Sequence, residues 1–360
     1  MPITTFDIWD QAQLTHAVQR ALTTGKENVP SLAAQIAPLT DVQSRKVKYR
    51  ISEVDAFGVG QLRAPDGNPQ LYRSSITYRD EFVELALPDE MERISEDVML
   101  RLQSSDPNIK ASAGVDVVTR GKILAERNRR RIEVMRWEAI LTGKVTLPYL
   151  DSNYQIDFGL PATHVVTAGT LWSDTTNADI ISQIRGWQKV VADDIGHYAT
   201  KIHMTSNTWD YVYNNAKIAA KLSTWGRGLM VPSSREEVAS LFRDGSEIVI
   251  YDGGYRAEGV KLGADSTKPN SSRGDANLTK YLPDGKVLLT TDYVIDGEPI
   301  ADTPNGQVMV ATGYNTADVR QGPQAETLLD PMSHNTFLRY GSAAIPRIRL
   351  PEAFLVATVL

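Results

Sequence analysis

A long helix is the feature that most constrains the fold of this chain. From Asp116 to Thr142 the sequence has no proline and only Gly121 as a breaker, and Gly143 follows as a natural helix stop. A helix of that length spans about 40 Å. Because a surface helix of a compact domain usually has one apolar stripe, two stripes would predict a spine packed between other structures. The C-terminal half has apolar residues on two nearly opposite sides: Ile132, Met135 and Ala139, and Val134, Trp137 and Leu141.

Alternating apolar and polar residues predict an extended hairpin over residues 44–80. Apolar residues alternate with lysines and arginines in 45–54, and a second alternating run follows at 71–79. Turn-forming glycines and a Pro-Asp-Gly sequence lie between the two runs. Ordering such a loop costs on the order of tens of kcal/mol of backbone entropy, which its few apolar residues cannot offset at about 25 cal/mol per Å². Since an isolated two-stranded hairpin is marginal in water, we expect it to lie on something else, such as another subunit.

The charge pattern around this hairpin suggests how it would lie. Residues 44–79 carry seven lysines and arginines against three acids, whereas residues 80–97 carry eight acids against one arginine. We therefore hypothesise that the basic hairpin of one subunit lies over the acidic segment of a neighbour and orients assembly. In the alternatives, the two stretches meet within one chain or are merely solvated. The expected intersubunit contacts are Lys46, Lys48, Arg50, Arg73, Arg79, Glu81, Glu84, Glu90 and Glu92.

The flanking regions predict an N-terminal arm and a mixed α/β domain. Residues 6–22 have loosely helical apolar spacing, and the stretch from Thr23 to Thr40 contains glycine and prolines typical of an irregular connection, so 1–43 would form an extended arm. From residue 178 onward, helical and strand patterns alternate without an internal repeat. The expected helices are 180–195, one capped by Asn207, and 233–242; the expected strands are 201–205, 247–251, 286–292, 307–312 and a β-rich segment 347–360.

Composition argues against several functional classes. A net charge of −6 argues against a chain whose main role is to neutralise nucleic-acid phosphates. Without cysteine, no disulfide framework, thiolate metal site or cysteine nucleophile can form. The sequence shows no signal peptide and no apolar run of the roughly 18 residues that a membrane span requires. We therefore expect a product made in a cytoplasm, with no membrane association.

No constellation of residues predicts catalysis or ligand binding. The five histidines include no His-Glu-x-x-His arrangement, and His197 and His203 fall on different expected elements, which favours ordinary partly buried histidines over a zinc site. The adjacent Asp193 and Asp194 are interpreted as a helix cap or a solvated pair. The arginines within 127–131 are flanked by glutamates and lack a stacking aromatic, which favours an ion-paired helix face over nucleic-acid contact. We predict no enzyme activity, catalytic residue, metal or cofactor.

Several stretches resemble the lambda-like family of tailed-phage major capsid proteins. The long helix runs into Trp137-Glu-Ala-Ile-Leu-Thr-Gly-Lys144 and then Ile156-Asp-Phe-Gly159, which is similar to the family's helix, Gly-Lys turn and Val-Asp-aromatic-Gly sequence. Each motif is weak alone, but together they form a collinear series over roughly residues 115–360. Further elements that resemble the family, in its order, are Trp172-Ser-Asp174 followed by Asp179-Ile180, Val249–Tyr255, Tyr281–Leu289 and Pro351–Val356.

The resemblance implies an α+β fold of the HK97-like capsid type. This fold brings no catalytic residues with it. Its expected parts are an N-terminal arm 1–43, an extended hairpin loop 44–80, a peripheral domain 81–175 with the spine helix 116–142, a mixed α/β axial domain 176–335, and a C-terminal strand segment 336–360 that returns to the subunit body.

The function implied by the resemblance is that of a structural subunit of an icosahedral phage head. Its hexamers and pentamers would enclose packaged double-stranded DNA without sequence-specific binding. The expected partners are further copies of the chain, a portal, a scaffolding protein and a decoration protein, in a virion capsid assembled in the bacterial host cytoplasm. The alternative with the same fold is an encapsulin-like nanocompartment shell. A soluble α/β enzyme is more remote, because the sequence shows no convergent nucleophile and base.

Overall fold

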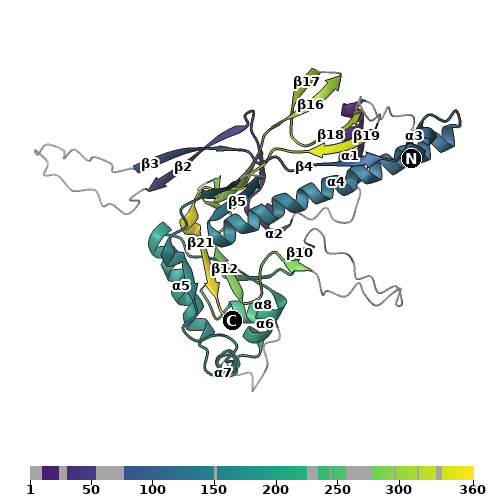
Figure 1. Cartoon of the computed structure of the whole chain (residues 1–360). Coiled ribbons are helices and arrows are strands. Elements are labelled where there is room, and N and C mark those ends of the chain that lie inside the picture. The colour runs from purple at the N-terminus through teal and green to yellow at the C-terminus, as the bar shows by residue number, and fades with distance from the viewer. Residues whose placement is uncertain are drawn as a thin grey trace, which may run out of the picture.

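The longest helix, α4 (Pro107–Thr142), runs through the computed structural model and divides it into two regions (Figure 1). The peripheral region follows most of the length of the helix, and the axial region lies below its C-terminal end. The structure describes residues 10–23, 31–53, 77–149, 152–224, 234–243, 245–256, 278–295, 297–313, 316–329 and 335–360.

Helix α4 begins earlier than its apolar pattern predicts. The side chain of Asp106 caps it by accepting a hydrogen bond from the Asn108 backbone N–H, and Pro107 occupies the first turn, where a missing N–H costs nothing. The prediction of a spine over 116–142 is therefore wrong at its start, because a capping signal lies upstream of the apolar pattern. The helix ends at the expected stop, where Gly143 has a φ of 68°, a left-handed conformation that favours glycine.

In the peripheral region, a three-stranded antiparallel sheet and two helices cover one side of α4. The sheet has the order β18 (Gln324–Leu329), β19 (Thr336–Gly341) and β4 (Asp89–Ile94). The helices are α1 (Gln11–Thr23) and α3 (Glu96–Leu102), whose apolar side chains form one core with α4 and the sheet. A separate antiparallel hairpin stands above the sheet (Figure 1) and consists of β16 (Gln307–Gly313) and β17 (Thr316–Gln321).

The axial region is built on a mixed five-stranded sheet. Its order is β7 (Val165–Thr167), β21 (Phe354–Thr358), β12 (Lys286–Thr290), β8 (Lys201–Met204) and β9 (Glu247–Ile250). The two outer pairs, β7 with β21 and β8 with β9, are parallel, and the inner pairs are antiparallel. One face of the sheet shares an apolar core with the helices α5 (Ile180–Ile195), α6 (Ser206–Tyr213), α7 (Ala216–Thr224) and α8 (Arg235–Ala239).

A second apolar core, which we call the joint, connects the other face of the axial sheet to the end of α4. The joint also includes α2 (Leu32–Ile36), the hairpin of β5 (Lys144–Tyr149) and β6 (Ser152–Asp157), and the small sheet β1 (Leu39–Asp41), β15 (Ala301–Asn305) and β20 (Arg347–Ile348). The short connecting elements are η1 (Ala162–His164), η2 (Pro351–Ala353), β10 (Gly254–Tyr255) with β11 (Thr279–Lys280), and β13 (Val294–Ile295) with β14 (Glu298–Pro299).

The predicted hairpin projects from the body as β2 (Lys46–Glu53) and β3 (Thr77–Glu84) (Figure 1). Its first strand lies where the alternating pattern places it. The second strand, expected at 71–79, extends instead to Glu84, because the acidic residues after position 79 pair with the basic strand β2. Residues 54–76, between the two strands, lie outside the described residues.

The prediction of an extended arm over 1–43 is wrong for the parts that the structure describes. Helix α1 packs against α4 and β18 with Leu14 and Val18 fully buried, and the Thr15 hydroxyl bonds to both the backbone O and N of Ala325 at 3.0 Å. Helix α2 lies in the joint, and β1 pairs with β15. An amphipathic helix is stabilised by covering an open core of its own chain, and this outweighs extension.

The predicted axial boundaries, 176–335, also need correction. Trp172 and β7 already belong to the axial region, and β15 to β18 lie outside its sheet. The expected C-terminal segment 336–360 is shared between all three parts, because β19 is peripheral, β20 is in the joint and β21 is axial. These assignments depend on pairing between strands that are distant in sequence, which local periodicity does not encode. By contrast, α5 coincides with the expected helix 180–195, and β8, β9 and β12 lie within expected strands.

Candidate assembly surfaces and the joint between the regions

The β2–β3 hairpin places the basic strand opposite acidic residues of its own chain. Lys46 lies across from Glu84, and Arg50 lies across from Asp80. A directly opposed pair of opposite charges stabilises a ladder by about 0.2–1 kcal/mol. The alternative in which the two charged stretches meet within one chain therefore accounts for part of the pattern. Of the other expected contact residues, the structure gives only the strand positions of Lys48, Arg79 and Glu81, and Arg73 lies outside the described residues.

Two of the expected intersubunit contacts, Glu90 and Glu92, are paired with α4 instead. Glu90 accepts a hydrogen bond from Arg127, with Nε and Oε2 2.5 Å apart, and Glu92 pairs with Arg120. Contact with a neighbour therefore stays a prediction for Glu90 and Glu92, and a neighbour's basic hairpin would have to compete with arginines that already pair with these carboxylates. The interpretation of the arginine run as an ion-paired helix face agrees with this contact of Arg127.

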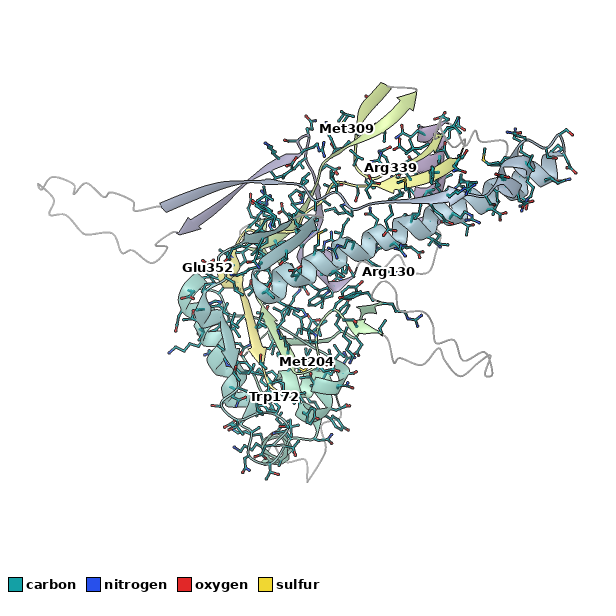
Figure 2. The ribbon with its side chains drawn as sticks, viewed as in Figure 1. Arg130, Trp172, Met204, Met309, Arg339 and Glu352 are labelled. Atoms are coloured by element: carbon teal, nitrogen blue, oxygen red, sulfur yellow. The ribbon has the colours of Figure 1, made fainter. Side chains whose placement is uncertain are left out.

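The opposite face of the peripheral sheet carries a charged centre among exposed apolar residues. Arg339 on β19 bonds to both carboxylate oxygens of Asp89 on β4, with its Nε 2.9 and 2.8 Å from them, and its Nη1 pairs with Glu326 on β18. Figure 2 shows Arg339 close to Met309 of the hairpin above it, whose backbone O accepts a hydrogen bond from Nη1 at 3.3 Å. Met91 and Met309 are 66% and 50% exposed, so this face is a candidate contact surface.

The C-terminal end of α4 contains a buried ion pair. Glu133 and Arg136 lie one turn apart with Oε2 and Nη1 3.5 Å from each other, and Arg136 Nε donates to the Thr303 hydroxyl at 2.8 Å. That hydroxyl in turn donates to the Ala37 backbone O at 3.0 Å. Burial lowers the pKa of Arg136, although the charge of Glu133 opposes this effect. The pair thus fixes the helix to β15 and to the end of α2.

The same glutamate orients the aromatic contact between α4 and the axial region. Trp137 Nε1 donates to Glu133 Oε1 at 3.2 Å, and the indole ring stacks on Tyr251 with 5.2 Å between centroids. Burial raises the pKa of Tyr251, and the charge of Glu133 adds to the shift. Of the residues expected to pack the spine, the structure buries three and leaves two half-buried: Met135, Trp137 and Leu141, and Ile132 and Val134.

A buried carboxylate connects the strands of the small joint sheet. Asp302 on β15 is fully buried and accepts hydrogen bonds from Arg347 and Arg349, with Nε of Arg347 2.8 Å from Oδ1 and Nη2 of Arg349 2.8 Å from Oδ2. Thr40 on β1 donates to the same carboxylate at 3.3 Å. Burial acts to raise the pKa of Asp302, but the two arginines outweigh it and hold the pKa below its usual value.

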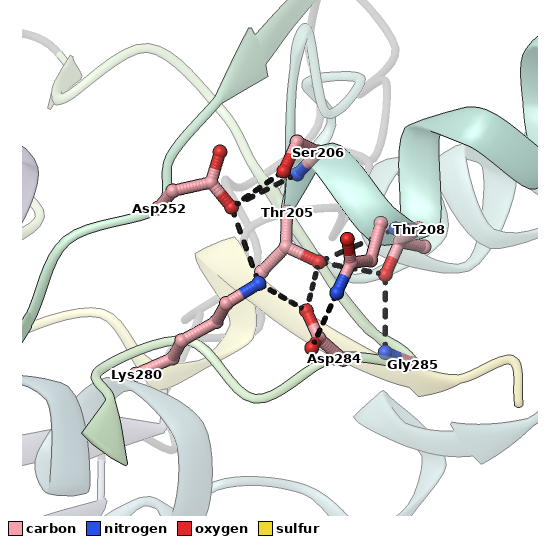
Figure 3. A network of polar contacts seen from close by, with 8 residues as sticks. Thr205, Ser206, Thr208, Asp252, Lys280, Asp284 and Gly285 are labelled. Carbon is pink, nitrogen blue, oxygen red and sulfur yellow. Dashed lines mark hydrogen bonds and ion pairs between the residues drawn. The ribbon is translucent and has the colours of Figure 1, made fainter. Parts of the chain in front are cut away.

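In the axial region, polar side chains tie the start of α6 to two turns (Figure 3). Thr205 caps α6 and donates to Asp284 at 2.6 Å, which corrects the expectation that Asn207 is the cap. Lys280 Nζ bonds to Asp284 at 2.8 Å and to Asp252 at 3.4 Å. The lysine neutralises both carboxylates, so the cluster has a structural role and holds the two turns against the start of α6.

The buried histidines also have structural partners. His164 Nε2 lies 2.7 Å from Asp194 Oδ2, and its Nδ1 lies 2.7 Å from the Phe354 backbone O, so Asp194 is neither a helix cap nor simply solvated as expected. His203 lies on β8, and its Nε2 is 3.1 Å from the Thr290 hydroxyl. Among the residues that the structure describes, no group of three or more His, Asp or Glu side chains is arranged to hold a metal ion.

Sequence reasoning missed most of these interactions for an identifiable reason. Asp302 and Arg347 are distant in sequence, and so are His164 and Asp194, and a single sequence contains no signal for such pairs. The start of α4 is different, because Asp106-Pro107 is a readable capping signal.

Comparison with known proteins shows which solved structures share this fold. None of the helices in the described ranges has both the length and the apolar character needed to cross a bilayer. The chain matches no family model and no curated protein. It is similar to the structure of a phage-related protein from Bordetella bronchiseptica RB50, with a TM-score of 0.56, 11% identity, and 98% of each chain covered.

A second structure is similar over nearly the same length. It is named as a candidate prophage capsid protein from Escherichia coli CFT073, and it has a TM-score of 0.57, 14% identity, and coverage of 96% of this chain and 99% of that chain. At such low identity these matches establish the fold. The expected α+β, HK97-like fold is confirmed over nearly the whole chain.

Proposed function

We propose that this chain is the shell-forming subunit of a tailed-phage or prophage head, of the lambda-like major capsid type. The observation that carries the proposal is the HK97-like fold shared over nearly full length with a candidate prophage capsid protein. The projecting β2–β3 hairpin supports it, because the described strands of this hairpin pair only with each other. A two-stranded ribbon of this kind is marginal alone and gains stability by lying on a neighbouring copy.

The arrangement of the regions fits a subunit that works by self-association. Axial regions would meet at the centre of hexamers and pentamers, while α4, about 54 Å long at 36 residues, connects each centre to the periphery. Many weak contacts between copies give high total stability and still permit errors to be corrected during growth. In this role the protein is structural and carries out no reaction.

The proposal also includes the contents of the shell, its partner proteins and the compartment in which it assembles. The shell would enclose double-stranded DNA without sequence-specific contacts, as a net charge of −6 favours. A portal, a scaffolding protein and a decoration protein would be its partners. Assembly would take place in the bacterial host cytoplasm, and the product would be the virion capsid.

Electron microscopy of the purified chain tests the proposal directly. We expect size-exclusion chromatography to give particles or capsomers, and negative-stain images to show rings or closed shells. A monodisperse monomer at all concentrations, with and without co-expressed scaffolding protein, would contradict the proposal. Shells that co-purify with one cargo protein would favour the nanocompartment alternative.

Charge reversal tests whether the hairpin contributes contacts between subunits. The triple variant Lys46→Glu, Lys48→Glu, Arg50→Glu should lower particle yield at least tenfold, because several charge pairs between subunits are lost. Circular dichroism should show that the monomer remains folded. The matched control adds Asp80→Lys and Glu84→Lys, which restores opposite charges at the two ladder positions where charged residues lie across from each other. Full recovery in the control would mean that pairing with Asp80 and Glu84 accounts for the whole effect. Continued loss would support a contact with a neighbour.

A further inference from the structure

The axial sheet face that turns toward the joint has one ionisable residue in an otherwise apolar row. Residues paired directly across neighbouring strands share a face of the sheet. His203 pairs with Leu288 and with Val249, and Leu288 and Val356 belong to the joint core. The complete row across the sheet is Val249, His203, Leu288, Val356 and Val165.

The hydrogen bonding of His203 accommodates only a neutral ring. Its side chain is fully buried, and its Nε2 is 3.1 Å from the Thr290 hydroxyl, which can donate or accept. Its Nδ1 has no hydrogen-bond partner among the described residues. A protonated imidazole carries a proton on each nitrogen, so it would leave a buried N–H without an acceptor.

The charges around the ring also disfavour protonation of His203, because Lys201 already places one positive charge nearby. Lys201, on the same strand, places its Nζ 3.8 Å from the centroid of Tyr293, and Tyr293 stacks on His203 at 6.2 Å. On the elements packed against this face, β9 carries Glu247, the segment after β12 carries Asp292, α4 carries the ion-paired Glu133 and Arg136, and α2 carries no charged residue. Burial, with a smaller effect of Lys201, lowers the pKa of His203 to about 3.

A cavity lies directly beside these groups. Its volume is about 440 Å³, and its wall is formed on one side by Ser31, Leu32 and Gln35 at α2. The other side is the axial sheet and its flank, including Lys201 and Tyr293, the neighbours of His203. Tyr293 therefore stands between the buried ring and a space that can hold water. We call this boundary between α2 and the axial sheet the seam.

We propose that His203 makes the seam sensitive to acid: the ring takes up a proton only when Tyr293 and α2 move away and water reaches Nδ1. This inference concerns the isolated chain and does not depend on the proposed function. A group that is neutral when buried and titrates normally when exposed favours the exposed state below its ordinary pKa. With a pKa of about 3 in the closed state and roughly 6.5 when exposed, the open population rises as pH falls below 6.5 and levels off near 3.

Hydrogen exchange of the full-length protein measures this opening. After correction for intrinsic exchange rates, peptides that cover α2, β8 and β12 should lose protection about 25-fold between pH 7 and pH 5, the ratio that these two pKa values give. His203→Phe keeps an aromatic ring against Tyr293 but cannot titrate, so its protection should be the same at both pH values. The control His197→Asn changes an exposed histidine and should keep the wild-type response.

Each outcome decides the question. Loss of protection at the seam in wild type and His197→Asn, but not in His203→Phe, supports the proposal. A flat wild-type profile overturns it, and so does a response that persists in His203→Phe, since another titrating group would then be responsible. If His203→Phe does not fold, His203→Leu extends the apolar row and serves as the second non-titrating variant. The readout is confined to the seam and is independent of particle assembly, so its failure is distinct from failure of the proposed function.

Discussion

The two halves of α4 perform different structural tasks with one continuous helix. Its peripheral half is covered on one side, where Val117 and Leu124 are buried, while Ile123 on another side is 50% exposed. Ion pairs to β4 flank this half. At the joint, the helix is covered on several sides, and even the charged Glu133 and Arg136 are buried. One half behaves as a surface helix and the other as a core element, so equal substitutions should have unequal costs.

The largest expected effect is at the joint. Arg136→Met removes the partner of a buried carboxylate, and breaking a buried pair costs about 3–5 kcal/mol. Urea denaturation should show this loss in the free energy of unfolding. The double variant Glu133→Gln, Arg136→Met removes both charges, keeps an acceptor for Trp137 Nε1 and should recover most of the loss. A single variant as stable as wild type would mean that the joint is solvated.

Helix α1 provides the next test, on the peripheral side. Leu14→Ala should destabilise the chain by about 3 kcal/mol, because Leu14 is fully buried against α4 and the sheet. Thermal unfolding provides the measurement. The control Leu39→Ala alters a leucine that is 58% exposed and should shift stability by less than about 0.5 kcal/mol. If Leu14→Ala and Leu39→Ala had equally small effects, α1 would not be packed against α4 and the peripheral sheet in solution.

A close approach between α1 and α4 gives a smaller effect. A Cβ added at Gly121 would lie 2.6 Å from Cγ2 of Val18, so Gly121→Ala should cost about 1–2 kcal/mol despite the better helix propensity of alanine. Val18→Ala removes the clash, so a double-mutant cycle should give a favourable coupling energy. Additive effects in that cycle would refute the predicted contact.

The smallest effect is expected at the exposed flank. Arg127→Gln breaks the pair with Glu90 and should cost no more than about 1 kcal/mol, because both side chains remain partly solvated. The difference from wild type should shrink in high salt. Arg131→Gln, at another exposed position on the helix, is the matched control and should be close to neutral. A loss comparable to that of Arg136→Met would erase the distinction between the two halves.

Local patterns in the sequence predicted part of this architecture. Gly143 marked the end of α4, and the alternating residues of 45–54 marked β2, because helix stops and strand periodicity depend on neighbouring residues. The partners of the acidic segment could not be predicted in the same way. Glu90 and Glu92 face α4 only because β4 pairs with β19, far along the chain. The interactions of Asp302 and His203 likewise arise from the packed fold and leave no local signal.

The position of β21 has a consequence for the way the protein is made. Residues 354–358 lie between β7 and β12, so the axial sheet remains divided until they are added. The ribosome synthesises the other four strands of that sheet before β21, so β7 and β12 lack the strand between them until then. The axial sheet is thus complete only after translation has passed residue 358. Folding of the axial region during synthesis therefore ends with its last strand.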